Sequence, residues 1–350
     1  MKILKYTLLV LFAISFFGYF LLQNHTVQNR LFENTVRQLF QADEIFMSDA
    51  LSVAVCGSRA PLPSPNRAET CLLVQAGTSK FIIDAGRGSA DNLQRWRVDY
   101  SDLEAVILSH LHSDHISDLH EVQFQSWLGG RKTPLPVLGP IGTASTAQGF
   151  AQAFKLDSIY RSEHHGEILP IEAYGYNVVE FDGDSNLIFQ NEDTRITAFK
   201  VDHFPVDPSY GFKIEYKDRS LVISGDTISL EVMAEYSKGV DVLFHDALAK
   251  PLIQEMERIS KEIGNNVISK VLLDIQDYHA STIEVADIAK RAEVDLLVFY
   301  HLIPAPINFI SEQMFLRGVD EIFSNHHVSE DGTLVSLPAG SDEILIDLID

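Results

Sequence analysis

One short segment rich in histidine, between an apolar run and a polar helix, constrains what this chain can fold into more than any other feature. AVILSHLHSDHISDL places His110, His112, Asp114 and His115 directly after AVILS, a run typical of a buried strand. Alternate residues of an extended segment point the same way, so His110 and His112 can bind one metal ion. Asp114 and His115 come where the chain turns into a helix, so they can face a second ion. Imidazole and carboxylate ligands suit zinc, iron or manganese.

The rest of the chain alternates short β-rich runs with helical ones. We expect strands at 51–56, 70–75, 80–84, 104–109, 195–202, 211–216, 220–224, 241–245 and 295–300. We expect helices at 116–127, 144–155, 229–237, 251–275 (broken near Gly264) and 281–292. Several of these strands are apolar throughout, which is typical of strands covered on both faces, whereas short connections between others predict antiparallel meanders. Two mixed sheets packed together, with helices outside, satisfy both observations.

The motif HLHSDH resembles the signature of the metallo-β-lactamase superfamily, and later segments narrow the resemblance. VDHFPVDPSYGFKIEY, SGDT, FHDA and DYHASTIEVADIAKRAEVDLLVFYHL are similar, in order and spacing, to the branch containing tRNase Z and the arylsulfatase-like and phosphodiesterase-like hydrolases. SVAVCGSRAPLPSPNRAETCLLV and KFIIDAGRGSADNL resemble that branch's opening strands and Gly-rich turn. The resemblance covers about residues 51–302 and implies an αββα sandwich, with the metal site at one edge between the sheets.

The resemblance also implies the remaining metal ligands. His203 would complete the first site with the first two histidines of the motif, and Asp226 would bridge both ions. His301 would join Asp114 and His115 at the second site. Each of the three added residues follows or ends an apolar strand, where a buried scaffold delivers ligands to a cleft. The implied cofactors are two divalent ions, zinc first, with manganese or iron as alternatives.

Three residues are candidates for the chemistry itself. Asp114 is expected to act in catalysis as well as in metal binding. His279 in DYHAST matches a histidine that the family places beside the metals, where it could donate a proton to the leaving group or hold a substrate oxyanion. Asp246 in FHDA stands where relatives often carry Glu and could orient His279, with a helix cap or a salt bridge as the alternative. Asp84 is expected to be a structural acid that orients the metal loop.

These residues predict a binuclear hydrolase in which a metal-bridging hydroxide attacks an ester. An aspartate bridge without a cysteine ligand suits an ester hydrolase better than a typical β-lactamase. The segment DHFPVD also differs from the PGHT-like segment of glyoxalase-type relatives. We expect phosphodiesters or sulfate esters before lactones and β-lactams. A tRNase Z-like endoribonuclease and an anchored, non-catalytic metal-binding module stay open as alternatives.

The charge balance argues against nucleic acid as a partner. The chain has 49 acidic and 27 basic residues and a formal net charge of −22, whereas neutralisation of phosphates by Lys and Arg dominates nucleic-acid affinity. The gap from His203 to Asp226 is also too short for the long tRNA-gripping arm that tRNase Z proteins often insert there. We therefore expect a small-molecule ester as substrate, and the sequence leaves a homodimer open.

The N-terminus predicts an export signal. Lys2 and Lys5 precede an uncharged apolar run over residues 7–22, which is short of the roughly 20 residues that cross a bilayer comfortably. A basic start before an apolar core is typical of export, and the bulky residues that follow favour an uncleaved signal anchor over a cleaved signal peptide. We therefore expect membrane contact through this segment and a cell-envelope location, anchored in the inner membrane or periplasmic.

The predicted organisation is a signal anchor or signal peptide at 1–22, a polar, helical spacer at 23–48 and a catalytic domain at 49–350. Cys56 and Cys71 lie in two short apolar stretches on either side of a Pro-rich loop. If these stretches pair as neighbouring strands, a disulfide is feasible in an oxidising compartment. The alternative is two buried free thiols, and the sequence does not decide between them.

Overall fold

The computed structural model describes residues 2–39, 41 and 45–349. The chain splits into two compact units, Met1–Asp43 and Glu44–Asp350. The first unit contains α1 (Lys2–Leu22) and α2 (His25–Leu39). Asn24 Oδ1 accepts hydrogen bonds from the backbone N–H groups of Thr26 and Val27, which stabilises the start of α2. Within the described part of the chain, no helix combines the length and the apolar character needed to cross a membrane.

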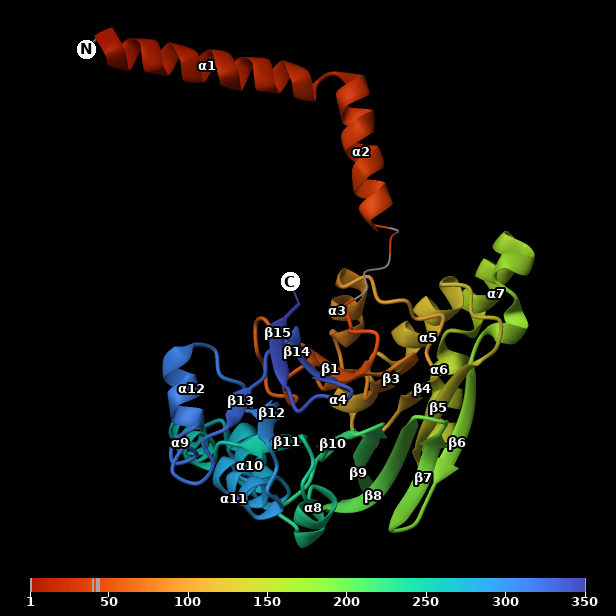
Figure 1. The fold of residues 1–350 in the computed structure, drawn as a ribbon, viewed down its shortest axis with the longest axis vertical. Helices are drawn as coiled ribbons and strands as arrows, with labels where there is room; N and C mark the ends of the chain where they lie inside the picture. Colours follow the sequence, from red (N-terminus) through yellow and green to blue (C-terminus); the bar gives the residue numbers. More distant parts are fainter. Residues whose placement is uncertain (1, 40, 42–44, 350) are drawn as a thin grey trace. The chain divides into compact units, whose positions relative to one another are not determined.

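The second unit is built on two mixed β-sheets (Figure 1). The strands of the first sheet lie in the order β15-β14-β1-β2-β3-β4-β5-β6, and those of the second in the order β13-β12-β11-β10-β9-β8-β7. The first sheet contains β1 (Ala50–Gly57), β2 (Cys71–Ala76), β3 (Ser79–Ile83), β4 (Ala105–Ile107), β5 (Leu135–Pro140), β6 (Tyr176–Phe181), β14 (Thr333–Pro338) and β15 (Leu345–Leu348). The second contains β7 (Ser185–Gln190), β8 (Thr194–His203), β9 (Val206–Tyr216), β10 (Arg219–Ile223), β11 (Val242–Leu248), β12 (Leu296–Ile303) and β13 (His326–Val328).

Helices cover the outer face of each sheet (Figure 1). On the first sheet pack α3 (Ser89–Arg95), α5 (Leu119–Leu128) and α6 (Thr143–Ala153). On the second pack α8 (Glu231–Tyr236), α11 (Thr282–Ala292) and α12 (Phe309–Phe315). The remaining helices are α4 (Ser113–Ile116), α7 (Lys155–His165), α9 (Lys250–Glu262), α10 (Asn266–Asp274) and the short 3-10 helices η1 (Gly166–Ile168), η2 (Ile171–Ala173) and η3 (Ile275–Asp277).

Three clusters of buried side chains fill the three interfaces between these layers. One lies between the two sheets and includes Phe212. A second joins the outer helices to the first sheet, where Leu93 of α3 packs with Val106 of β4. A third joins the outer helices to the second sheet, where Ile288 of α11 packs with Phe299 of β12. Central strands are therefore buried on both faces, and the predicted αββα architecture is confirmed.

The nine strands expected from the sequence are all present, with small differences at their ends. The sequence missed β5, β6 and β7 and the C-terminal strands β13, β14 and β15. All residues of β6 and β7 except Phe181 are exposed or half-buried, and polar residues limit the apolar runs of these strands to three residues at most. The helix expected at 116–127 is two helices, α4 and α5, and α3, α7 and α12 were not expected.

Cys56 of β1 and Cys71 of β2 form a disulfide, with a Cα–Cα distance of 5.0 Å. The two strands pair antiparallel, and Cys71 lies opposite Gly57 at an irregular point of the ladder. The bond therefore closes the base of the loop that joins β1 to β2. The sequence left open whether Cys56 and Cys71 are bonded or are free thiols, and in the structure they are bonded.

Candidate metal centre

Strand ends bring the predicted ligands together from distant parts of the chain. His203 is the last residue of β8, and Asp226 comes three residues after the end of β10. His301 lies inside β12, where the pairing with β11 slips by one residue. Its φ of +45° belongs to the left-handed region. Such a bulge turns a side chain out of the regular alternation, and it directs His301 toward the other ligands.

The four ligands of the HLHSDH segment follow β4 and continue into α4. The segment packs directly on the loop after β3. A Cβ added to Gly86 would stand 2.1 Å from the carbonyl oxygen of Asp114 and 2.7 Å from Cβ of Glu69. The Ala85 N–H donates a hydrogen bond of 2.7 Å to the His115 carbonyl. Glycine at position 86 therefore allows the two loops to touch, which holds the metal loop in place.

The ligand atoms form two groups, and within each group they lie within 4.8 Å of one another. The first group is His110, His112, His203 and Asp226, and the second is Asp114, His115 and His301. Asp226 Oδ2 lies 3.8 Å from His203 Nε2 in the first group and 3.2 Å from His301 Nε2 in the second. The structure thus brings all seven predicted ligands together, and Asp226 faces both groups.

Hydrogen bonds orient the imidazole rings from outside the cluster. His115 Nδ1 donates to Asp84 Oδ2 at 2.8 Å, and the same oxygen accepts from Ser109 Oγ at 2.7 Å. His203 Nδ1 donates to the Tyr278 carbonyl at 3.0 Å. With these Nδ1 atoms engaged, the Nε2 atoms of His115 and His203 face the ligand cluster, an arrangement typical of metal-binding histidines. Asp84 therefore has the orienting place that the sequence predicted for it.

The electrostatics of the cluster suit metal binding. Burial lowers the pKa of His110 well below its ordinary range and that of His203 to about 4, so both are neutral near pH 7. Neutral imidazole is the form that binds metal. Burial would raise the pKa of Asp114, but His115 and His301 outweigh it and lower this pKa to about 2. Asp114 is therefore ionised at neutral pH and available as a ligand.

Buried polar atoms without hydrogen-bond partners also indicate that the cluster binds metal. Among the described residues, these atoms include Asp226 Oδ1 and His115 Nε2. A buried polar atom left unsatisfied costs about 1–3 kcal/mol, and a bound cation would satisfy both of these. The donor set consists of imidazoles and carboxylates, which zinc, manganese and iron accept. The residues present therefore fit divalent metal ions.

His279 and Asp246 form a pair beside this cluster. His279 Nδ1 donates a hydrogen bond of 2.9 Å to Asp246 Oδ2. Ligand atoms of His279, Asp226 and His301 also lie within 4.8 Å of one another. Asp246 is completely buried within β11 and caps no helix, and it contacts His245 as well, with 3.0 Å from His245 Nδ1 to Asp246 Oδ1. The contact that the sequence proposed between His279 and Asp246 is thus present.

A cavity of about 430 Å³ opens beside the cluster. His112, His203 and Tyr278 line it, together with Pro205, Asp274 and Asp277. Tyr278 was missed, although it directly precedes His279 in DYHAST, and its position next to a candidate catalytic residue was the available signal.

Known proteins resemble this chain in sequence and in fold. A family model described as Anti-Pycsar protein Apyc1 matches residues 57–261. Ribonuclease Z of Mycobacterium bovis (strain BCG / Pasteur 1173P2) is 34% identical over 261 residues, which cover 73% of this chain and 87% of that protein. The metallo-β-lactamase fold protein YhfI from Bacillus subtilis superposes with a TM-score of 0.60 at 20% identity, over 82% of this chain and 100% of that one. The short form of human tRNase Z superposes with a TM-score of 0.58 at 20% identity, over 82% and 99%.

The predicted partners are wrong. The relatives are named ribonuclease Z, which contradicts a small-molecule ester substrate and the exclusion of nucleic acid. The exclusion relied on the net charge of the whole chain, and this sum does not report the charge around one site. Sulfate esters, which the sequence also favoured, have no counterpart among the relatives above.

The predicted cell-envelope location and the membrane contact through the N-terminal segment are also wrong. They are contradicted by the ribonuclease Z relatives. The physical weakness of the prediction was the length of the apolar run, which stops short of a bilayer's thickness.

The predicted chemistry is confirmed at the level that the relatives share: the chain is a metal-dependent hydrolase that acts on ester bonds. Both the family match and the ribonuclease Z match span more than half of the chain. The chain belongs to the metallo-β-lactamase superfamily, in the branch that contains ribonuclease Z and the Anti-Pycsar protein Apyc1 family.

Proposed function

We propose that this protein is a metal-dependent phosphodiesterase that cleaves RNA, as a ribonuclease Z-like endoribonuclease whose activity resides in residues 49–350. One observation carries the proposal. Asp226 lies between two groups of ligand atoms, with His279 beside them, on a chain 34% identical to a ribonuclease Z over 87% of that protein.

The cluster would hold two divalent ions, and we propose zinc. The first ion would use the first group of ligands and the second ion the second group, with Asp226 shared between them. When bound, such ions supply a water of lowered pKa and positive charge beside the phosphoryl oxygens. The protein's own part is to keep His110 and His203 neutral through burial. It also orients the rings of His115 and His203 through Asp84 and the Tyr278 carbonyl.

We propose that His279 donates a proton to the ribose oxygen that leaves when the bond is cleaved. Its Nδ1 donates to Asp246, so the acid would be the doubly protonated imidazolium, whose Nε2 proton passes to the leaving oxygen. A positioned general acid of this kind contributes about 10²–10⁴-fold to the rate. Asp114, ionised near neutral pH, would place a carboxylate oxygen beside the attacking water as well as binding metal.

We assign the nucleotide next to the cleaved bond to the cavity beside the cluster. Tyr278 is half-buried there, next to His112 and His203. An aromatic ring of this kind offers a stacking face to a base, and such stacking contributes about 1–3 kcal/mol per base. Such stacking does not depend on which base is present. It therefore suits an enzyme that selects a place in the RNA chain and not a particular base sequence.

The proposal is tested with the full chain, an end-labelled RNA transcript and bis(p-nitrophenyl) phosphate. We expect RNA cleavage that a chelator abolishes and zinc or manganese restores. Asp226→Asn should lower cleavage by about 10³-fold or more and lower the metal content. The matched control is Asp207→Asn, because Asp207 lies in β9 outside the cluster and its carboxylate pairs with Lys200 at 2.7 Å.

Two results would overturn the proposal. Cleavage of RNA by Asp226→Asn at the wild-type rate would mean that the activity does not come from this site. Metal-dependent hydrolysis of bis(p-nitrophenyl) phosphate without RNA cleavage would retain the phosphodiesterase and reject RNA as its substrate.

A further inference from the structure

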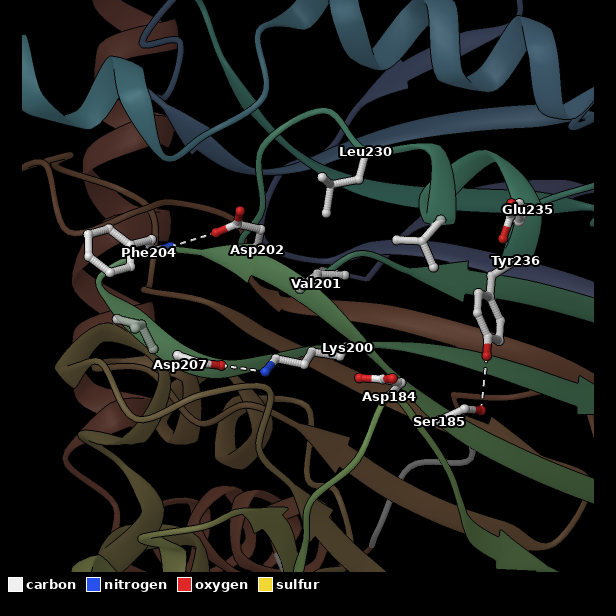
Figure 2. A pocket seen from close by; sticks show the side chains of 12 residues that line it. Asp184, Ser185, Lys200, Val201, Asp202, Phe204, Asp207, Leu230, Glu235 and Tyr236 are labelled. Atoms are coloured by element: carbon white, nitrogen blue, oxygen red, sulfur yellow. Dashed lines mark hydrogen bonds and ion pairs between the residues drawn. The ribbon is translucent and has the colours of Figure 1, made fainter.

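An RNA-cleaving enzyme with a net charge of −22 needs a local concentration of positive charge. One cavity of about 730 Å³ does not provide it (Figure 2). The carboxylates of Asp184, Asp202, Asp207 and Glu235 line it, and its one lysine, Lys200, is paired with Asp207. The strand that ends at His203 borders this cavity, and the carboxylates of its lining repel a phosphate chain there.

A second cavity, of about 540 Å³, has the opposite character. Its charged lining residues are four arginines and two aspartates: Arg59, Arg67, Arg87, Arg95, Asp91 and Asp331. We call it the arginine cavity. Its arginines come from two segments, the loop between β1 and β2 and the region from the end of β3 through α3.

The two arginines of the first segment are engaged within the protein. Arg59 is buried, lies 3.1 Å from Glu69 and donates to the carbonyl of Arg67 at 2.7 Å. Arg67 donates to Ser58 Oγ at 2.8 Å and to the Ser329 carbonyl at 2.6 Å. These bonds fix the loop, so this part of the wall is preformed.

The two arginines of the second segment face solvent. The Arg87 side chain is 70% exposed, and its contact with Glu69 is long, at 3.4 Å. Arg95, at the end of α3, is also exposed. Their guanidinium groups carry a permanent charge and can bind phosphate oxygens with paired N–H donors. They are therefore the groups in this cavity that a ligand can reach.

One of the two carboxylates is occupied by donors. Asp331 accepts from the backbone N–H of Ser58 at 3.0 Å, from the backbone N–H of Ala68 at 2.6 Å and from Asn92 Nδ2 at 2.8 Å. These bonds take up its oxygens and direct them away from a phosphate. Asp91 is exposed, as Arg87 and Arg95 are, and offsets part of their charge, but the four arginines outnumber the two aspartates of the lining. The cavity thus retains an excess of positive charge.

The arginine cavity adjoins the second group of metal ligands. Arg87 follows Gly86, which touches Asp114 through the close approach described above. On the other side, the Leu302 N–H donates to the Ser58 carbonyl at 3.0 Å, directly after His301 and directly before Arg59 in their segments. Gly86 therefore connects one wall of the cavity to the metal centre, and the pair of Ser58 and Leu302 connects the other.

We propose that the arginine cavity binds a backbone phosphate of the RNA near the one that is cleaved, through Arg87 and Arg95. This inference rests on the proposed ribonuclease function. Because the cavity beside β8 carries the carboxylates of Figure 2, this part of the RNA approaches the metals past the arginine cavity. The positive charge of this cavity would then allow a protein with a negative net charge to bind RNA.

The test measures binding of the full chain to a fluorescent single-stranded RNA of about ten nucleotides, with a chelator present to prevent cleavage. The dissociation constant is measured at several salt concentrations. Each phosphate contact adds about 0.7 to the slope of log K against log salt on single strands, so Arg87→Gln with Arg95→Gln should reduce the slope by about 1.4. Affinity at low salt should fall by about tenfold.

Two control variants separate charge from structure. Arg87→Lys with Arg95→Lys keeps both charges and should retain the wild-type slope. Arg195→Gln removes a surface arginine that is 51% exposed and lies 3.8 Å from Glu215, and it should also retain the slope. Melting temperatures of all variants check that each one is folded.

The outcomes are distinct. A wild-type slope in the double glutamine variant, or no binding of the RNA by the wild-type chain, would overturn the arginine site. Binding that depends on Arg87 and Arg95, without cleavage after zinc or manganese is added, would support the site and count against the proposed function.

Discussion

His279 Nδ1 donates a hydrogen bond of 2.9 Å to Asp246 Oδ2, although the two residues are 33 positions apart in the chain. Asp246 is completely buried in β11. Burial would raise the pKa of this carboxyl, but His245 and His279 outweigh it and lower the pKa. The carboxylate therefore stays ionised and holds one proton of His279 on Nδ1, so in the doubly protonated ring the proton on Nε2 is the one available to the substrate.

Replacing His279 should separate two kinds of substrate. We expect His279→Gln to lower kcat on RNA by about 10²-fold, because the ribose oxygen needs a proton as it leaves. On bis(p-nitrophenyl) phosphate the loss should be small, since nitrophenolate leaves without a proton. Asp246→Asn should follow the same pattern with a loss of about tenfold.

His120→Gln is the control for this experiment, because the His120 ring stacks on Phe154 at 3.3 Å between centroids, outside the ligand cluster. Rates on the two substrates are compared by single-turnover kinetics. Equal losses on both substrates in His279→Gln would contradict a role in protonating the leaving group.

Asp84 should control metal affinity without binding metal. Its Oδ2 accepts from His115 Nδ1, and its Oδ1 accepts from the Ser109 N–H at 2.8 Å. We expect Asp84→Asn to weaken binding of one metal ion by about 10–100-fold, because outer hydrogen bonds hold a ligand histidine in its binding orientation. Titration with a competing chelator measures this, and an affinity equal to that of the wild type would refute the role.

The metal-free protein should lose stability as the pH falls from 6.5 toward 4. Burial lowers the pKa of His203 from its ordinary value of 6.5 to about 4. Over this interval the unfolded chain binds a proton that the folded chain rejects, so the contribution of His203 is complete above pH 6.5 and is lost toward pH 4. The difference corresponds to at most about 3 kcal/mol.

Burial also lowers the pKa values of His110 and His112, so these two residues add to the same loss of stability. Asp114, His115 and His301 titrate outside this interval. The pKa of Asp114 is lowered to about 2, so its contribution is lost only at more acidic pH. The pKa values of His115 and His301 are raised despite burial, by Asp226 above all, so their contribution is already complete below pH 6.5. Urea unfolding of chelated protein across this range is the measurement, and an equally steep pH dependence in His203→Gln would contradict the assignment.

The disulfide should stabilise the second unit by about 3 kcal/mol. Cys56 and Cys71 are 15 positions apart, and linking them restricts the loop between β1 and β2 in the unfolded chain. We expect Cys56→Ser with Cys71→Ser to lower the free energy of unfolding by this amount, measured in urea. A reductant should destabilise the wild type and leave the double variant unchanged, and a wild type insensitive to reductant would contradict the prediction.

Much of the central architecture was predictable because it depends on local pattern. The runs FII at 81–83 and LVI at 221–223 are apolar because their strands are covered on both faces, so composition alone marks them. The strands β6 and β7 escaped prediction because their side chains are partly exposed and polar. The bulge that directs His301 inward also leaves no mark in the composition of its strand.

The charge of the chain shows where such reasoning fails. The chain has 49 acidic and 27 basic residues, and this balance led to the wrong exclusion of nucleic acid as a partner. Arg59 and Arg95 lie 36 positions apart, and only the packing of α3 against the β1–β2 region places them around one cavity. Net charge is a sum, whereas binding depends on where the charges lie.

The sequence by itself determined which strands are buried and which imidazoles and carboxylates lie at strand ends, because both follow from residue type and local spacing. Only the tertiary structure decided that Asp226 faces both ligand groups, that Asp246 holds His279 and that Cys56 meets Cys71. These are distances between residues far apart in the chain. They are set by how the two sheets pack and where their strands end, which no local pattern encodes.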